Sequence, residues 1–412
     1  MQLSSRQKAL LVSSSASYTF WGIVATIGPL AASGSIVGHV TGALKVFLLL
    51  IGPIFAPIGN FTMGFLADMF GRKRVFVVTM LSYTIGIIIV AASSTVWSLV
   101  PGLMLAQFGV GGEESPSLSL IAEDSPVSKR AKYLTLVANF SNIGSALISG
   151  LFLITSSSLF DRLMLLGSSL AMVGVMVYSR LSIPESYRWL SSVGRERDAS
   201  EEKAHLSIDE EGTKAQRMGV PFIYATLVLI GISQYLTFGL MAYVIGPYEF
   251  PSTAVDNEII FVALLGASVA GFAAAPLINR ERKSYTLYSY LAGVVSMVAI
   301  FLTVPYLHDM DLFLPLLFVN MATSEFGWAS RTTLEPELFP TRVRARSIGM
   351  VRLAPMIAYA IFTYATSSLN LGQFILVNLI LWAIGLAGAA IWYFFGYETR
   401  GIDIDYGAGQ AQ

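Results

Sequence analysis

Residues 123–132 read EDSPVSKRAK, and residues 337–346 read ELFPTRVRAR. Both stretches carry an acid, a proline and a basic cluster at matching places, 214 positions apart, which is 337 minus 123. In two further pairs of stretches, the members of each pair are similar in sequence and lie nearly the same distance apart. The pairs are GFLADMFGRKR (64–74) with GFAAAPLINRERK (271–283), and ESYR (185–188) with ETR (398–400). Each copy follows a long apolar stretch, so the sequence indicates a chain built from two related halves.

The composition predicts a membrane protein. Hydrophobic residues make up 54% of the 412 residues and charged residues only 13%, against about 25% charged in an ordinary soluble chain. The formal net charge is zero, and we expect no nucleic-acid partner. Cysteine is absent and the three histidines lie far apart, so we expect no disulfide, no metal site and no cofactor.

Twelve stretches are long and apolar enough to cross a membrane, since a span needs about 20 mostly apolar residues. Their expected ranges are 15–37, 45–68, 74–94, 97–121, 132–155, 160–182, 219–246, 258–279, 284–305, 311–336, 345–367 and 371–396. The first stretch lacks a small-residue cleavage site, which favours a span over a removable signal peptide. The sequence therefore predicts an all-α membrane protein, with twelve transmembrane helices in two pseudo-symmetric six-helix halves. Two such halves with a substrate site between them are typical of secondary transporters.

Basic residues fall in every second connection between these spans, for example in residues 72–74, 129–132 and 280–283. The opposite connections carry acids, among them Asp256 and Asp309. Cytoplasmic loops are enriched in Lys and Arg, so we expect a multi-pass protein of the cell membrane with both termini in the cytoplasm. The expected divisions are an N-terminal half (1–183), a cytoplasmic linker (184–218), a C-terminal half (219–400) and a cytoplasmic tail (401–412).

Four motifs at helix ends resemble those of the major facilitator superfamily, and within it the sugar-porter-like branch of the general sugar and organic-ion transporter group. They are GFLADMFGRK (64–73), PESYRWL (184–190), ELFPTRVRA (337–345) and YETRG (397–401). The resemblance covers essentially the whole chain. It implies the major facilitator fold and the transport of a small-molecule substrate by alternating access, by a monomer. GGEESP (111–116) is closer to branches that carry phosphate, carboxylates or organic ions, so the resemblance does not name the substrate.

These motifs place acids and bases at the predicted cytoplasmic ends of the spans. An exposed ion pair contributes only about 0–1 kcal/mol, but a network of pairs can bias an equilibrium between open and closed forms. We expect this network to act as a gate, and the alternative is that the charges only set topology and helix packing. The candidate gating residues are Asp68, Arg72, Glu123, Arg130, Glu185, Arg188, Glu337, Arg344, Glu398 and Arg400.

Charges inside the predicted spans are candidates for function. Each one costs about 2.5–3.5 kcal/mol on insertion scales at the bilayer centre, so such residues face a bundle interior or a cavity. Carboxyls held away from water favour their neutral form, which suits a proton carrier, and the candidates for proton coupling are Glu113, Glu114 and Glu325. Arg352 is expected to neutralise one of them or to hold an anionic substrate, and a purely structural buried pair is the alternative.

Uncharged polar and aromatic residues complete the candidate substrate site. Amides bind hydroxyl groups and aromatic faces pack on C–H surface, which together suit a hydroxylated ligand. For each single residue, helix packing is the competing interpretation. Together with Arg352, the candidates are Gln234, Asn320, Trp328, Tyr243, Asn139, Asn142 and Trp21.

These features predict a secondary active transporter, not an enzyme, because no catalytic triad, nucleotide-binding loop or metal motif is present. The expected substrate is a small polar organic solute carried in symport with protons, with a sugar favoured over an organic anion such as a carboxylate or phosphate. An uncoupled facilitator is an alternative, because the first span lacks an acid. A non-transporting membrane sensor is the alternative from another class.

Overall fold

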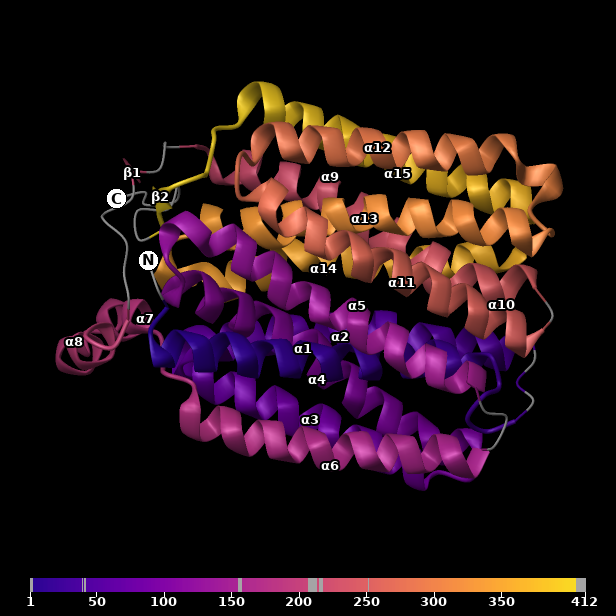
Figure 1. The fold of residues 1–412 in the computed structure, drawn as a ribbon, viewed down its shortest axis with the longest axis horizontal. Helices are drawn as coiled ribbons and strands as arrows, with labels where there is room; N and C mark the ends of the chain where they lie inside the picture. Colours follow the sequence, from indigo (N-terminus) through magenta and orange to yellow (C-terminus); the bar gives the residue numbers. More distant parts are fainter. Residues whose placement is uncertain are drawn as a thin grey trace.

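The computed structural model describes residues 3–38, 40, 42–154, 158–206, 213–214, 218–250 and 252–404. Long helices run side by side in two bundles, one from each half of the chain (Figure 1). The N-terminal bundle consists of α1 (Ser5–Ala32), α2 (Ala43–Phe70), α3 (Arg72–Ala92), α4 (Val96–Asp124), α5 (Arg130–Ile154) and α6 (Ser158–Ser182). The C-terminal bundle consists of α9 (Val220–Gly239), α10 (Ile245–Glu249), α11 (Thr253–Ile278), α12 (Lys283–Leu302), α13 (Met310–Leu338), α14 (Arg344–Ala365) and α15 (Leu371–Phe395).

Eleven helical segments in the described part of the chain are long and apolar enough to cross a membrane, with α9 and α10 forming one of them. The 29-residue α4 is of the same length but is more polar. Every residue of α4 from Gly109 to Asp124 is buried, so this part of the helix is surrounded by protein and needs no apolar surface. With α4 as the twelfth, the expected all-helical arrangement of two six-helix halves is confirmed.

The outer faces of the bundles are apolar. Leu170 and Leu181 of α6 and Phe395 of α15 each keep more than 70% of their surface exposed. Exposed apolar surface of this extent would be unfavourable in water and is suited to lipid. Figure 1 shows α6 at the outer edge of the N-terminal bundle.

The connection between the halves lies at one end of the bundles, which we call the linker end (Figure 1). It contains α7 (Tyr187–Ser192), α8 (Glu196–Lys203) and β1 (Thr213–Lys214). β1 pairs in parallel with β2 (Ile402–Asp403), which follows the last helix. The linker is therefore tied to the other end of the chain. The expected linker and tail lie partly outside the described residues, at 207–212, 215–217 and 405–412.

A single glycine joins α2 to α3 at the linker end. Gly71 has φ of 105°, in the left-handed region that side chains disfavour. A Cβ on Gly71 would lie 2.3 Å from Oε2 of Glu185, so the position has no room for a side chain. This turn places Arg72 at the start of α3, directly beside the end of α2.

Helix packing across the halves also depends on close approach. A Cβ on Gly271 of α11 would lie 2.1 Å from Cγ of Asn139 in α5. Because residue 271 is a glycine, the Asn139 side chain fits against α11, and its amide donates to the Ser268 carbonyl at 2.9 Å. The two halves therefore meet along α5 and α11 with almost no separation.

Candidate functional site

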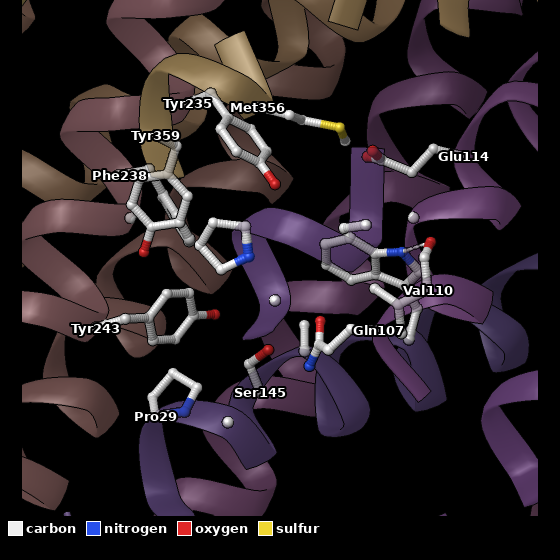
Figure 2. A pocket seen from close by; sticks show the side chains of 18 of the residues that line it. Pro29, Gln107, Val110, Glu114, Ser145, Tyr235, Phe238, Tyr243, Met356 and Tyr359 are labelled. Carbon is white, nitrogen blue, oxygen red and sulfur yellow. Dashed lines mark hydrogen bonds between the residues drawn. The ribbon is translucent and has the colours of Figure 1, made fainter. Parts of the chain in front are cut away.

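A cavity of about 100 Å³ lies between the two halves, near the middle of the bundles. Its walls come from α1, α2, α4 and α5 on one side, and from α9, the turn after it, α13 and α14 on the other. Figure 2 shows side chains of both halves converging on it, with the Glu114 carboxylate and the Tyr243 hydroxyl pointing inward from opposite sides. Because both halves line the cavity, it is the candidate site for a small solute.

Aromatic rings cover much of this wall. Trp21 of α1 lies 6.3 Å from Trp328 of α13, and Trp328 lies 6.4 Å from Phe238 of α9, between ring centroids. On the opposite side, Tyr235 and Tyr359 meet edge to face at 5.5 Å. Aromatic faces of this kind pack well against the C–H surface of a ring-shaped solute.

The helix that carries Gln234 and Tyr243 changes its winding at the cavity. Residues Leu240–Val244 form a π-helical turn between α9 and α10, and Tyr243 is part of it. A π turn interrupts the regular ladder of hydrogen bonds and is frequent at functional sites. The sequence predicts one continuous span over 219–246, and the turn is the feature that this prediction lacked.

Gln234 lies in the wall together with Arg331. Nη1 of Arg331 donates to Oε1 of Gln234 at 2.7 Å, and Nε of Arg331 donates to Oε1 of Glu335 at 2.9 Å. The guanidinium also lies 5.6 Å from the ring centroid of Tyr235. The amide oxygen of Gln234 is therefore held in place by a buried cation.

Glu114 is the charged residue that the N-terminal half contributes to the wall. Its carboxylate forms an ion pair with Arg352 of α14, across the boundary between the halves. Nε of Arg352 also donates to Oε2 of Glu335, at 2.6 Å. Arg352 itself does not line the cavity. It joins Glu114 to the Arg331–Glu335 pair, so that two arginines and two glutamates balance each other's charge.

The other two candidates for proton coupling, Glu113 and Glu325, are not among the residues of the cavity wall. Glu113 accepts a hydrogen bond from Ser17 at 2.6 Å, and Ser17 is also bonded to the Tyr83 hydroxyl, so this site lies inside the N-terminal half. Glu325 of α13 accepts from the Asn142 amide of α5 at 2.7 Å. In the part of the chain described here, neither glutamate forms an ion pair with a cation.

The remaining candidate residues occupy different places. Asn142 lines the cavity and donates also to Oδ1 of Asn139, which lies behind it, at 3.2 Å. Trp21 lines the cavity, and its indole N–H donates to the Val110 carbonyl at 2.7 Å. Asn320 lies inside the C-terminal half, where its amide donates to Ser296 at 2.9 Å.

At the linker end, two glutamates form the centres of matching clusters. Glu123 pairs with Arg72 of its own half at 3.3 Å and with Arg344 of the other half at 2.6 Å. Glu337 pairs with Arg282 of its own half at 3.1 Å and approaches Arg130 of the other half at 4.0 Å. All are buried. The sequence repeat therefore appears in the structure as a pair of equivalent ionic clusters that join the halves.

Other charged residues support these clusters. Asp68 pairs with Arg72 at 2.9 Å and accepts from the backbone N–H of Arg346 across the halves, also at 2.9 Å. Glu185 accepts from the backbone N–H groups of Arg72 and Lys73. Burial raises the pKa of the Glu185 carboxyl, and the donated hydrogen bonds oppose that effect.

Three further candidate gating residues lie at the rim of the clusters. Arg188 pairs with Asp403 of the C-terminal end at 3.0 Å. Glu398 accepts from the backbone N–H of Arg282 at 2.9 Å, which matches the role of Glu185 in the first half. Arg400 is exposed and donates to the Arg280 carbonyl at 2.8 Å, within its own half.

Contacts also join the halves at the opposite end. Lys45 of α2 donates to the Pro247 carbonyl at 3.0 Å and lies 3.8 Å from Asp256 of α11. Thr253 donates to the Ser33 carbonyl at 2.8 Å. The cavity is therefore bounded by cross-half contacts at both ends, with more ion pairs at the linker end.

Sequence reasoning missed three residues of these networks: Arg331, Glu335 and Arg282. Arg331 falls inside the tenth expected span, 311–336, but is not among the candidate charges there; it is buried within α13 and lines the cavity. The signal available was the spacing of Arg331 and Glu335, because residues four apart on a helix can pair. For Arg282, the signal was its position at the start of a helix in the second copy of the Arg72 motif.

The family model described as sugar (and other) transporter matches residues 41–406 of this chain. The chain is 25% identical over 386 residues to the minor myo-inositol transporter IolF of Bacillus subtilis, covering 87% of this chain and 84% of IolF. It is 26% identical over 299 residues to the putative niacin/nicotinamide transporter NiaP of the same organism, covering 71% of this chain and 70% of NiaP.

Solved structures with the same fold include the proton:xylose symporter XylE bound to 6-bromo-6-deoxy-D-glucose. It matches with a TM-score of 0.80 at 14% sequence identity, over 98% of both chains. The inward-open form of XylE from E. coli matches with a TM-score of 0.70 at 15% identity, over 97% of this chain and 98% of XylE.

Proposed function

This chain belongs to the sugar (and other) transporter family of the major facilitator superfamily, and from that premise we propose that it carries a small neutral hydroxylated ring, a sugar or a cyclitol, together with protons. It is a multi-pass membrane transporter of sugars or other metabolites, not an enzyme. We propose that it works as a monomer by alternating access, in which the linker end and the opposite end open in turn.

The observation that carries the proposal is the cavity between the halves. Its wall combines aromatic faces with the amides of Gln107, Asn142 and Gln234 and the hydroxyl of Tyr243. Amides and hydroxyls both donate and accept hydrogen bonds, as the hydroxyl groups of a polyol require. The myo-inositol transporter among the relatives supports a cyclic polyol as the substrate class.

The charges around the cavity support a neutral substrate. Arg352 is held by Glu114 and Glu335, and Arg331 by Glu335 and Gln234. An anion that bound here would have to displace one of these buried partners, and separating a buried pair is costly. A neutral solute can bind without disturbing them.

We propose that the linker end faces the cytoplasm. It carries the basic loops at the starts of α3, α5 and α12, and cytoplasmic segments are enriched in Lys and Arg. In this orientation both ends of the described chain lie on the cytoplasmic side. The clusters of Glu123 and Glu337 then close the cytoplasmic gate.

The test of the proposed function is counterflow in proteoliposomes made from the purified chain. Vesicles loaded with unlabelled solute should accumulate the same solute in labelled form transiently, for myo-inositol or an aldohexose. Nicotinate and succinate serve as the comparison. Counterflow of nicotinate with none for any polyol would overturn the assignment of a neutral substrate, and counterflow for no solute would favour the sensor.

A small carboxylate is the second candidate, and one observation favours it. Arg331 reaches the cavity wall, and a guanidinium binds a carboxylate through two parallel hydrogen bonds. The niacin transporter among the relatives agrees with this possibility. Under this alternative, the carboxylate would replace Gln234 as the partner of Arg331, and nicotinate would compete with the polyol in the counterflow assay.

A further inference from the structure

We propose that Glu114 and Arg352 form a proton-controlled latch between the halves. In this account the ion pair holds the linker end closed, and Glu114 takes up the coupled proton as that end opens. The inference rests on the proposed function, because it names which of the three candidate glutamates couples transport to protons. It concerns a site away from the linker-end clusters, at the wall of the cavity itself.

The two partners of the latch are not equivalent. Arg352 has one acid across the boundary, Glu114, and one in its own half, Glu335. Glu114 has Arg352 as its one cationic partner among the residues that the structure describes. When the halves separate at the linker end, Arg352 keeps Glu335, whereas Glu114 loses its counter-charge.

An unpaired carboxylate at this depth is unfavourable. Removing one partner of a buried ion pair leaves an uncompensated charge, which is strongly destabilising, and the surrounding membrane raises the cost further. A proton removes the charge. Opening the linker end and protonating Glu114 therefore favour each other.

Among the described residues around Glu114, no other cation is available to balance the charge of its carboxylate. Tyr18 of α1 and Tyr235 of α9 lie near the carboxylate, and tyrosine is neutral at physiological pH. From α13 the facing charges are Arg331 and Glu335, which pair with each other at 2.9 Å. From α14 the facing charge is Arg352, and within α4 the neighbouring acid is Glu113.

The other candidate glutamates do not change their counter-charge when the halves move. Glu113 is bonded to Ser17 of α1, which belongs to the same half. Glu325 is bonded across the halves, but its partner Asn142 is uncharged. Separation of the halves would break the hydrogen bond of Glu325 and leave that of Glu113 intact. Neither carboxylate would lose a counter-charge, so neither would need to take up a proton.

The direction of the pH effect follows from this difference. The linker-open form binds one proton more than the linker-closed form, so acid shifts the population toward the open form and alkali toward the closed form. For a single proton the ratio of open to closed changes by at most about tenfold per pH unit. A proton that enters the cavity from the opposite end thus releases the latch, and loss of the proton to the linker side restores it.

The chain has no cysteine, so the movement can be measured without background labelling. Arg74 at the start of α3 and Arg342 before α14 are exposed and lie at the linker end of different halves. Spin labels at Arg74→Cys and Arg342→Cys report the distance between the halves by double electron–electron resonance. In the otherwise native chain, the long-distance population should grow as the pH falls from 8 to 5.

Glu114→Gln should show a large long-distance population at every pH, with no pH response. The matched control is the adjacent Glu113→Gln, which should keep the native response because Glu113 lies outside the latch. A native pH response in Glu114→Gln would overturn the proposal, as would a loss of the response in Glu113→Gln alone. Circular dichroism and the elution volume in detergent show whether each variant is folded.

This measurement needs no substrate, so its failure is separate from failure of the proposed function. If counterflow of a polyol is present but Glu114→Gln still accumulates the polyol in response to a pH gradient, the latch is wrong and the transporter assignment stands. If the pH-dependent movement is present but no polyol is carried, the latch stands and the substrate class is wrong.

Discussion

At the scale of single residues, we expect the pairing of Gln234 with Arg331 to influence how a solute binds. The arginine donates to the amide oxygen at 2.7 Å, and the two N–H groups of the amide are donors that a ligand could use. A hydroxyl oxygen accepts such a bond. Gln234 is therefore a candidate donor toward the cavity.

We therefore expect Gln234→Ala to weaken binding of the transported polyol. One neutral hydrogen bond contributes about 0.5–1.5 kcal/mol, which corresponds to a change in Kd of about 2- to 13-fold. Isothermal titration of the purified variant measures this directly. Asn320→Ala is the control, because Asn320 lies inside the C-terminal half, and an equal loss in both variants would argue against a direct role of Gln234.

Arg352→Lys tests the charge of the substrate. A lysine carries the charge but lacks the planar fork that reaches Glu114 and Glu335 together. For a neutral solute, we expect Kd to change by less than about tenfold, or 1.4 kcal/mol, while accumulation driven by a pH gradient falls. A much larger loss of affinity, with none in Gln234→Ala, would instead indicate an anion bound by Arg352.

The sequence predicted which residues are chemically unusual better than it predicted where they point. Glu114, Gln234 and Trp328 are found in the cavity wall, whereas Glu113 and Asn320 are turned into the interior of one half. Adjacent helical residues differ by about 100° in direction, so a small rotation of a helix decides which side chain faces the cavity. Helix rotation depends on packing between distant parts of the chain, which a single sequence does not contain.

At the scale of elements, the turn between α2 and α3 ties both halves together. Arg72 donates from this turn to the Thr341 carbonyl of the other half at 2.7 Å, and Asp68 binds the Arg346 backbone. Under the proposed alternating access, these contacts break and form again in each transport cycle. Their strength therefore affects the rate of the cycle more than the binding of the solute.

Asp68→Asn and Arg72→Ala should lower the rate of transport while leaving folding and solute affinity largely intact. Both residues lie at the linker end, away from the cavity wall. Initial rates in proteoliposomes and titrations in detergent separate the two quantities. Arg74→Ala is the control, because Arg74 lies on the same turn of α3 and is exposed. Normal rates in both variants would contradict a gating role.

The opposite end offers a similar test. Lys45→Ala removes the cation that bonds Pro247 and approaches Asp256, so the end distant from the linker should open more often. A cysteine placed at Ser145, in the cavity wall, should then react faster with a small thiol reagent. Lys45→Arg is the matched variant that keeps the charge. Equal labelling rates in Lys45→Ala and the parent would show that this contact does not close the cavity.

Apolar length predicted the helices well, but it could not show where the winding changes. The expected span at 219–246 contains the π turn at Leu240–Val244, which Gly239 precedes and Gly246 and Pro247 follow, but these residues do not by themselves predict a π turn. The winding of a helix depends on tertiary contacts, which override local preference, so apolar length alone does not show it.

At the scale of the whole molecule, the repeat in the sequence becomes a repeat of ionic clusters. Each glutamate binds one arginine of its own half and approaches one of the other, but the cross-half distances are 2.6 Å for Glu123 and 4.0 Å for Glu337. The two clusters are thus similar but not equal in strength. The sequence predicted this network from its repeated motifs, because helix ends, unlike helix rotations, are marked by proline and by basic residues.

The most direct test of the central claim is to prevent the halves from separating at the linker end. The Asn279 amide donates to the Ser128 carbonyl across the halves at 3.0 Å, so cysteines at these two positions can be joined by a short reagent that has two thiol-reactive ends and a cleavable bond between them. The control joins Ser191→Cys to Glu196→Cys, which lie together within the linker at the ends of α7 and α8. If the halves move in turn around the cavity, the first crosslink should abolish counterflow, cleavage should restore it, and the control crosslink should leave it unchanged. Counterflow that continues at the parental rate with the Ser128–Asn279 link intact would contradict alternating access around this cavity.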